Sequence, residues 1–151
     1  MIRLLTRTQV LPITLKEAWE FFSSPANLNE ITPPNMSFEI LSELPPKMYE
    51  GMFIRYKISP LLGIKLDWCT EITHIDEEKF FVDEQRVGPY KIWHHEHHFR
   101  AVENGVEMVD ILHYDIGLGM LGWLAGKLWV DQQVQTIFNY RYQKLTELFN
   151  R

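Results

Sequence analysis

The chain has 151 residues, a length that suits one hydrophobic core, so we expect a single domain over residues 1–151. Hydrophobic residues make up 46% and charged residues 23%, as is typical of folded globular proteins. The net charge of −5 disfavours a nucleic-acid partner, because an acidic surface repels phosphate backbones. Cys69 is the single cysteine, which excludes an internal disulfide and a four-cysteine zinc site.

The sequence contains no apolar run that approaches the roughly 20 residues needed to cross a bilayer. Residues 1–7 also lack the apolar run and cleavage site of a signal peptide. We therefore expect a cytoplasmic protein without a transmembrane segment. The sequence does not distinguish a monomer from a homodimer.

The first predicted elements are a strand over 2–11 and two short helical segments. Thr14 and Glu17 have the spacing of a capping box, which places the start of the first helix at Thr14. The second segment covers 26–31. The prolines at 33–34 then force extended chain.

Alternation of apolar and polar residues predicts six further strands, over 38–44, 52–58, 64–72, 79–87, 90–101 and 106–116. Their short connections favour antiparallel neighbours. The segment that ends at residue 149 reads as a long helix, because one stripe carries Val134, Phe138, Arg141, Leu145 and Leu148. A sheet with one apolar face needs such a cover. The sequence therefore predicts an α+β fold, in which a curved antiparallel sheet of about seven strands wraps around the C-terminal helix.

Several motifs along this order of elements resemble the SRPBCC superfamily, also called START-like or Bet v 1-like. The resemblance is strongest to its small bacterial polyketide cyclase/dehydrase-type branch. It is carried by 19–28 (WEFFSSPANL), 31–34 (ITPP), 83–85 (DEQ), 88–90 (GPY), 93–99 (WHHEHHF), Asp110, Tyr114 and 137–141 (IFNYR). The resemblance implies a helix-grip fold with a deep apolar cavity between the sheet and the C-terminal helix. Members of the superfamily hold lipids, hormones, quinones or polyketides there, and only some are enzymes.

Two histidines are predicted to face the interior from the strand over 90–101. Alternation places His95 and His97 on one face, between the large rings of Trp93 and Phe99. Imidazoles exchange protons near neutral pH, so the pair could act as acid and base. Buried histidines also serve as hydrogen-bonded core residues, and this interpretation is favoured.

The histidine pair could also chelate a metal ion, with Asp110 as a third ligand. The outward residues His94, Glu96 and His98 offer a second, exposed set. Neither set follows a defined metal-ligand spacing, so we expect no metal and no other cofactor.

The pattern also places charged residues on apolar faces. Asp110 and Tyr114 share one face of their strand, and Arg141 lies on the apolar stripe of the last helix. A buried carboxylate needs a partner, so we expect Arg141 to pair with Asp110 or Asp83. Alternatively, the Arg141 head group reaches water at a cavity mouth.

The glycines at 117, 119 and 122 match a dinucleotide-binding pattern, but no room remains for the parallel strand that a Rossmann unit requires. The apolar segment 117–129 could form a cavity entrance, buried core or an exposed patch that binds a second copy or a membrane surface. Cys69 has no evident histidine partner, so we expect an unreactive thiol.

Two functions remain. The favoured one is non-catalytic binding of an apolar small molecule, such as a lipid, quinone, polyketide or aromatic compound. The expected cavity residues are Tyr56, Trp68, Trp93, His95, His97, Asp110, Tyr114, Trp123, Phe138 and Arg141. The alternative is a cyclase or dehydratase-type lyase, with His95 or His97 as the acid–base group and Tyr114 as a hydrogen-bond donor.

Overall fold

The computed structural model describes residues 1–61, 63–117 and 129–150. Its elements are β1 (Arg3–Leu11), α1 (Leu15–Phe22), η1 (Pro25–Asn29), η2 (Pro34–Met36), β2 (Glu39–Ile40), β3 (Met52–Leu61), β4 (Ile64–Asp76), β5 (Phe80–Val87), β6 (Ile92–Val102), β7 (Gly105–Asp115) and α3 (Asp131–Phe149). The predicted α+β class and order of elements are confirmed. No helix within these residues is long and apolar enough to cross a membrane.

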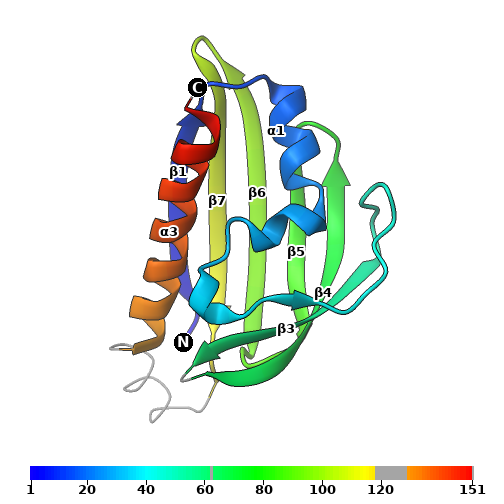
Figure 1. Ribbon diagram of the computed structural model, residues 1–151, viewed down its shortest axis with the longest axis vertical. Helices are drawn as coiled ribbons and strands as arrows, with labels where there is room; N and C mark the ends of the chain where they lie inside the picture. The colour runs from blue at the N-terminus through cyan, green and yellow to red at the C-terminus, as the bar shows by residue number, and fades with distance from the viewer. Residues whose placement is uncertain (62, 118–128, 151) are drawn as a thin grey trace.

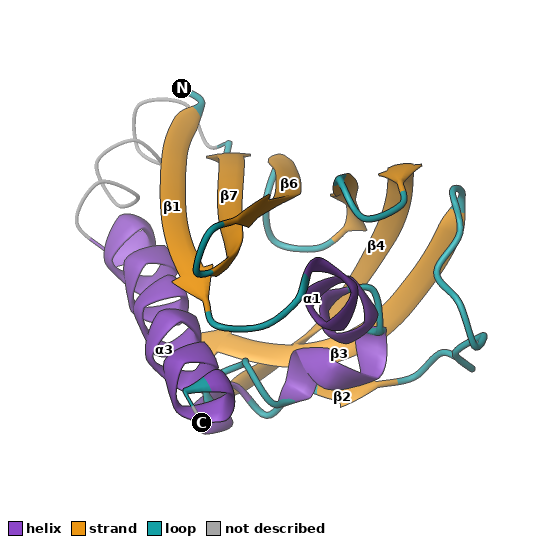
Figure 2. Ribbon diagram, turned by 90° about the horizontal axis from the view of Figure 1, so that it is seen from above, coloured by secondary structure: helices purple, strands orange, loops and turns teal. Residues whose placement is uncertain are grey.

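The strands form one antiparallel sheet in the order β1-β7-β6-β5-β4-β3-β2. Figure 1 shows α3 lying along β1 and β7, while α1 lies over the middle strands. Seen from above in Figure 2, the sheet curves from β1 round to β3, with α1 inside the curve. One concave apolar face is therefore covered by helices, as a helix-grip fold requires.

Local side-chain hydrogen bonds determine where α1 begins and where β2 ends. Thr14 and Glu17 form the predicted capping box at the start of α1. The predicted strand over 38–44 is reduced to β2, because the Ser42 hydroxyl accepts the Arg55 backbone N–H at 2.7 Å. A side chain thus takes the place of a backbone partner, and strand pairing ends there.

The hairpin between β6 and β7 sets which side chains meet on the concave face. Gly105 has φ +141°, and a Cβ atom at this position would overlap the backbone carbonyl oxygen of Leu11. Glycine is therefore required where the turn passes against β1. The resulting register places His97 opposite Asp110. On the other side of β6, the separate pairing with β5 places His95 opposite Asp83.

Helix α3 carries the predicted stripe toward the sheet. Its buried residues are Val134, Phe138, Arg141 and Leu145. Three of these are apolar and pack in the core, whereas Arg141 is 7% exposed although it is charged. Such burial requires compensating partners.

Candidate functional site

A partly enclosed cavity of about 170 Å³ lies between the concave face of the sheet and the covering helices. Its wall is mostly apolar and aromatic, with Phe38, Tyr56, Trp68, Tyr90, Trp93 and Phe138 among its rings. The volume is close to that of an engineered cavity of about 150 Å³ that holds benzene. The cavity therefore has room for a ring-sized molecule.

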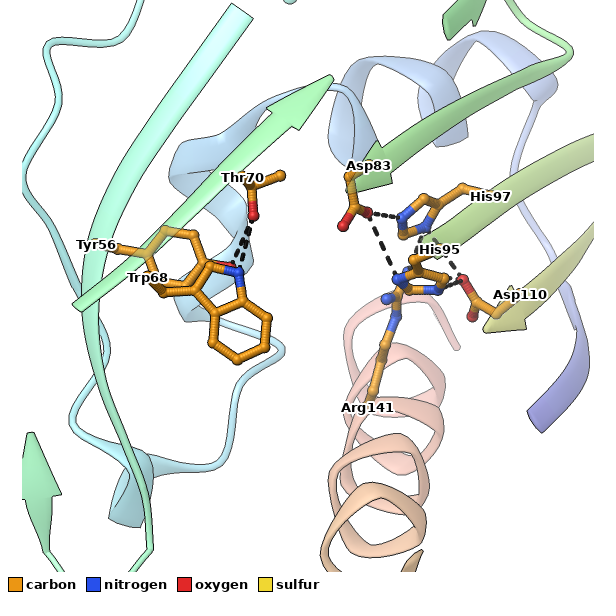
Figure 3. Close-up of polar contacts among 8 residues, drawn as sticks. All are labelled: Tyr56, Trp68, Thr70, Asp83, His95, His97, Asp110 and Arg141. Atoms are coloured by element: carbon orange, nitrogen blue, oxygen red, sulfur yellow. Dashed lines mark hydrogen bonds and ion pairs between the residues drawn. The ribbon is translucent and has the colours of Figure 1, made fainter. Parts of the chain in front are cut away.

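Three titratable side chains on β5 and β6 lie together on the cavity wall: Asp83, His95 and His97, here called the Asp–His cluster. Oδ2 of Asp83 is 2.6 Å from Nε2 of His97 and 3.5 Å from Nδ1 of His95. The ring centroids of His95 and His97 are 3.8 Å apart. Figure 3 shows the carboxylate and both rings converging.

Two further charged residues contact this cluster or its neighbours: Asp110 on β7 and Arg141 on α3. Oδ1 of Asp110 is 3.1 Å from Nε2 of His95 and 3.1 Å from Nδ1 of His97. The Arg141 guanidinium is 3.4 Å from the same oxygen (Figure 3). Of the two partners predicted for Arg141, Asp110 and Asp83, the structure shows the ion pair with Asp110. Each imidazole is therefore placed between two carboxylates.

The surroundings shift the pKa values of the two carboxyl groups and the two imidazoles in different directions. Burial opposes ionisation of Asp110, but the Arg141 guanidinium and the imidazoles hold its pKa well below the usual range. Burial also opposes ionisation of Asp83, yet the hydrogen bond from His97 and the electrostatic effect of the neighbouring imidazoles lower its pKa. Both carboxylates are therefore ionised.

The two imidazoles differ in their proton affinity. Burial and the neighbouring His97 lower the pKa of His95. Burial also acts against His97, but its contacts with Asp110 and Asp83 outweigh that effect and raise the pKa of His97. A proton taken up by the pair is thus held by His97 rather than by His95.

A second polar group lies on the wall formed by β3 and β4. Trp68 Nε1 donates to the Thr70 hydroxyl oxygen at 3.1 Å, and the Tyr56 hydroxyl is 3.1 Å from the same oxygen (Figure 3). Burial raises the pKa of Tyr56, so its phenol stays neutral. These groups satisfy one another, which leaves the cavity wall there effectively apolar.

The structure brings most of the predicted cavity residues to one place. Those on the wall are Tyr56, Trp68, Trp93, His95, His97, Phe138 and Arg141. Asp110 lies behind the imidazoles rather than on the wall. The Tyr114 hydroxyl donates to Asp131 Oδ1 at 2.8 Å and lies away from the cavity wall.

The position of α3 explains these two differences. The helix runs along β1 and β7 (Figure 1), and Asp110 and Tyr114 contact its residues Arg141 and Asp131 instead of the cavity. Trp123, like most of the 117–129 segment, falls outside the described residues. Cys69 carries a free, half-buried thiol.

Asp83 is the cavity residue that the sequence analysis missed: it was named as part of the 83–85 motif and as an alternative partner for Arg141. The structure places it on the cavity wall, opposite His95 across the β5–β6 pair. The alternation of side chains along β5 indicates that Asp83 faces inward, because it shares its face with the buried Phe81. On the opposite face of β6, His94, Glu96 and His98 are half-exposed and pair among themselves and with Glu84.

Comparison with known proteins supports the fold. No family model matches the chain, and no curated protein matches its sequence. Among solved structures, protein TTHA0849 from Thermus thermophilus superposes with a TM-score of 0.68 at 18% identity, covering 96% of this chain and 95% of that one. The Zhui aromatase/cyclase from Streptomyces sp. R1128 gives 0.70 at 16% identity, covering 100% and 95%. Ara h 8.0201 gives 0.60 at 13% identity, covering 97% and 99%.

The chain has a Bet v 1-like, helix-grip fold. Its identity to these structures is low, so the likeness describes architecture, and function has to be argued from the site.

Proposed function

We propose that the protein binds a small, largely apolar molecule that has one polar substituent. The observation that carries this proposal is a ring-lined cavity with the ionisable Asp–His cluster on one wall. A few fixed polar groups in an apolar pocket are the usual means of orienting a ligand. We place this activity in the cytoplasm.

Asp83 is the group on which the orientation of the ligand depends. Its side chain is 16% exposed, more than twice the exposure of His95 or His97, at 6% and 7%. Its ionised oxygens accept hydrogen bonds, so a hydroxyl or N–H group on the ligand fits this end of the cavity. A charge-assisted hydrogen bond of this kind contributes about 1.5–3 kcal/mol.

The apolar walls supply the remaining affinity. Trp93 and Phe138 both pack near His95, with ring centroids 6.4 Å and 5.4 Å from the imidazole. A ring inserted beside them loses contact with water, at about 25 cal/mol for each Å² of apolar surface. We therefore favour a ligand with one aromatic ring.

A second candidate is a cyclase or dehydratase-type lyase of the polyketide cyclase/dehydrase-type branch. It is favoured by one feature: each cavity-facing imidazole is oriented by a carboxylate. The Zhui aromatase/cyclase has the same fold. For a catalytic role, His97→Gln must abolish turnover of a polyketide-like substrate while its affinity persists; joint loss of both indicates binding alone.

The binding proposal is tested with two probes of nearly equal shape, 4-ethylphenol and 4-ethyltoluene, in the presence of EDTA. NMR titration of the tryptophan indole N–H signals reports on Trp68 and Trp93 in the wall. We expect 4-ethylphenol to bind about tenfold or more tightly, the equivalent of one charge-assisted hydrogen bond. Equal affinities would contradict the orienting role of the Asp–His cluster.

A matched pair of variants on α3 locates the bound probe. Ile137 is half-buried and lines the cavity, whereas Asn139 is exposed on the same helix. Ile137→Trp fills the cavity and is expected to abolish binding, while Asn139→Trp leaves it unchanged. Binding that survives Ile137→Trp would place the probe elsewhere and overturn the proposal.

A further inference from the structure

We propose that the Asp–His cluster is a binding site for one divalent first-row transition-metal ion. One ligand atom each from Asp83, His95 and His97 lies within 4.8 Å of the others. Two imidazoles and one carboxylate are a donor set that suits Zn²⁺, Fe²⁺ or Co²⁺. The proposal depends on the positions of these three side chains and not on whether an organic molecule binds.

The spacing of the three groups fits coordination to one ion. Ligand atoms bonded to a metal at about 2.1 Å in tetrahedral geometry lie about 3.4 Å apart. The Asp83 oxygen is 2.6 Å from His97 Nε2 and 3.5 Å from His95 Nδ1, so the observed separations lie on both sides of that value. Small rotations of the side chains would bring the three atoms to bonding distance. The incoming ion would displace the proton between His97 Nε2 and Asp83, and that proton would be released to solvent.

The groups behind the cluster have the arrangement of a second shell. A metal-bound histidine usually gives its other ring N–H to a carboxylate, which fixes the tautomer and the ring orientation. The ring nitrogens that point away from Asp83, Nε2 of His95 and Nδ1 of His97, are each 3.1 Å from Asp110 Oδ1. Arg141 neutralises this carboxylate at 3.4 Å. One aspartate thus orients both proposed ligands.

The site also has room for further ligands. Asp83, His95 and His97 all lie on the cavity wall, so the remaining coordination positions face that space. Water or an oxygen atom of a bound molecule would occupy them, as at metal sites with open positions.

The experiment uses Co²⁺ as the probe, because its visible absorption reports directly on its ligands. Protein stripped with EDTA and returned to metal-free buffer is titrated with Co²⁺ alone. We expect one ion per chain and loss of the bands on adding Zn²⁺. Asp110→Asn should weaken binding about 10–100-fold, as for other second-shell changes, and Asp83→Asn by more than about 100-fold.

One control and one replacement variant distinguish this site from chance binding at the surface. The double variant His94→Gln/His98→Gln removes the exposed histidines of β6 and should bind Co²⁺ as the wild type does. If Asp83→Asn fails to fold by circular dichroism, His95→Gln replaces it as the ligand variant. Absence of stoichiometric binding, or binding lost in the double variant and kept in the ligand variant, would overturn the proposal. Since no organic probe is present, this result is independent of the phenol titration.

Discussion

The Arg141 guanidinium lies 3.4 Å from the Asp110 carboxylate, with side chains only 9% and 10% exposed. This contact joins α3 to β7 beneath the Asp–His cluster. The guanidinium carbon also lies 5.5 Å and 6.0 Å from the ring centroids of Phe22 and Phe138. Charge compensation and ring contacts together explain why an arginine is buried on the apolar stripe of the helix.

Arg141→Met should destabilise the protein by about 3–5 kcal/mol, because it leaves the Asp110 carboxylate buried without its cation. Urea unfolding followed by circular dichroism measures the change. Lys144 on the same helix provides the control, since its pair with Glu147 is 34% and 70% exposed. Lys144→Met should change the free energy of unfolding by less than about 0.5 kcal/mol. Equal effects of the two substitutions would contradict the role given to Arg141.

A double variant tests whether this cost comes from the orphaned charge. Adding Asp110→Asn to Arg141→Met removes the uncompensated carboxylate, so stability should recover by at least about 1 kcal/mol relative to Arg141→Met alone. If the two changes instead add without coupling, the guanidinium stabilises the protein only through its contacts with Phe22 and Phe138.

Tyr114→Phe distinguishes a structural tyrosine from a ligand-binding one. The hydroxyl donates to Asp131, which also lies 3.0 Å from Arg3, and neither contact involves the cavity wall. We expect a loss of about 1.5 kcal/mol of stability, as for a hydrogen bond to a charged acceptor. The affinity for 4-ethylphenol should not change. A loss of affinity without a loss of stability would indicate that Tyr114 contacts the ligand.

Gly105→Ala tests the turn that sets the register between His97 and Asp110. The added methyl group would collide with the Leu11 carbonyl oxygen in addition to straining a positive φ, so we expect a loss of about 3 kcal/mol or more. Gly51 is the control, because it also has positive φ (+82°) but no atom within 4 Å of an added Cβ. Gly51→Ala should cost about 1 kcal/mol, measured by thermal unfolding. Similar losses at both positions would exclude the collision as the cause.

Alternation and spacing predicted the features that depend on local pattern. The inward face of β6 could be derived because Trp93 and Phe99 bracket the histidines, and both imidazoles are buried. The stripe on α3 placed Arg141 toward the sheet for the same reason. The sequence could not show that Arg141 pairs with Asp110 and not with Asp83, because the pairing depends on how α3 lies across β7.

The features that could not be predicted depend on three-dimensional placement. Asp110 and Tyr114 share a face of β7, but that face lies under α3, so neither reaches the cavity wall. The third member of the Asp–His cluster is Asp83, brought opposite His95 by the β5–β6 register. The sequence pattern shows that Asp83 lies on the same face of its strand as the buried Phe81. The pairing of β5 with β6 was needed to show that it lies beside His95.

The central claim is that the cavity holds a ring with its polar group at Asp83. The most direct measurement is a crystal structure of the protein with 4-ethylphenol, prepared with EDTA. We predict the ring beside Trp93 and Phe138 and the phenol oxygen within hydrogen-bonding distance of the Asp83 carboxylate. A phenol bound on the outer face of the sheet, or one in the cavity with its hydroxyl turned away from Asp83, would contradict the account.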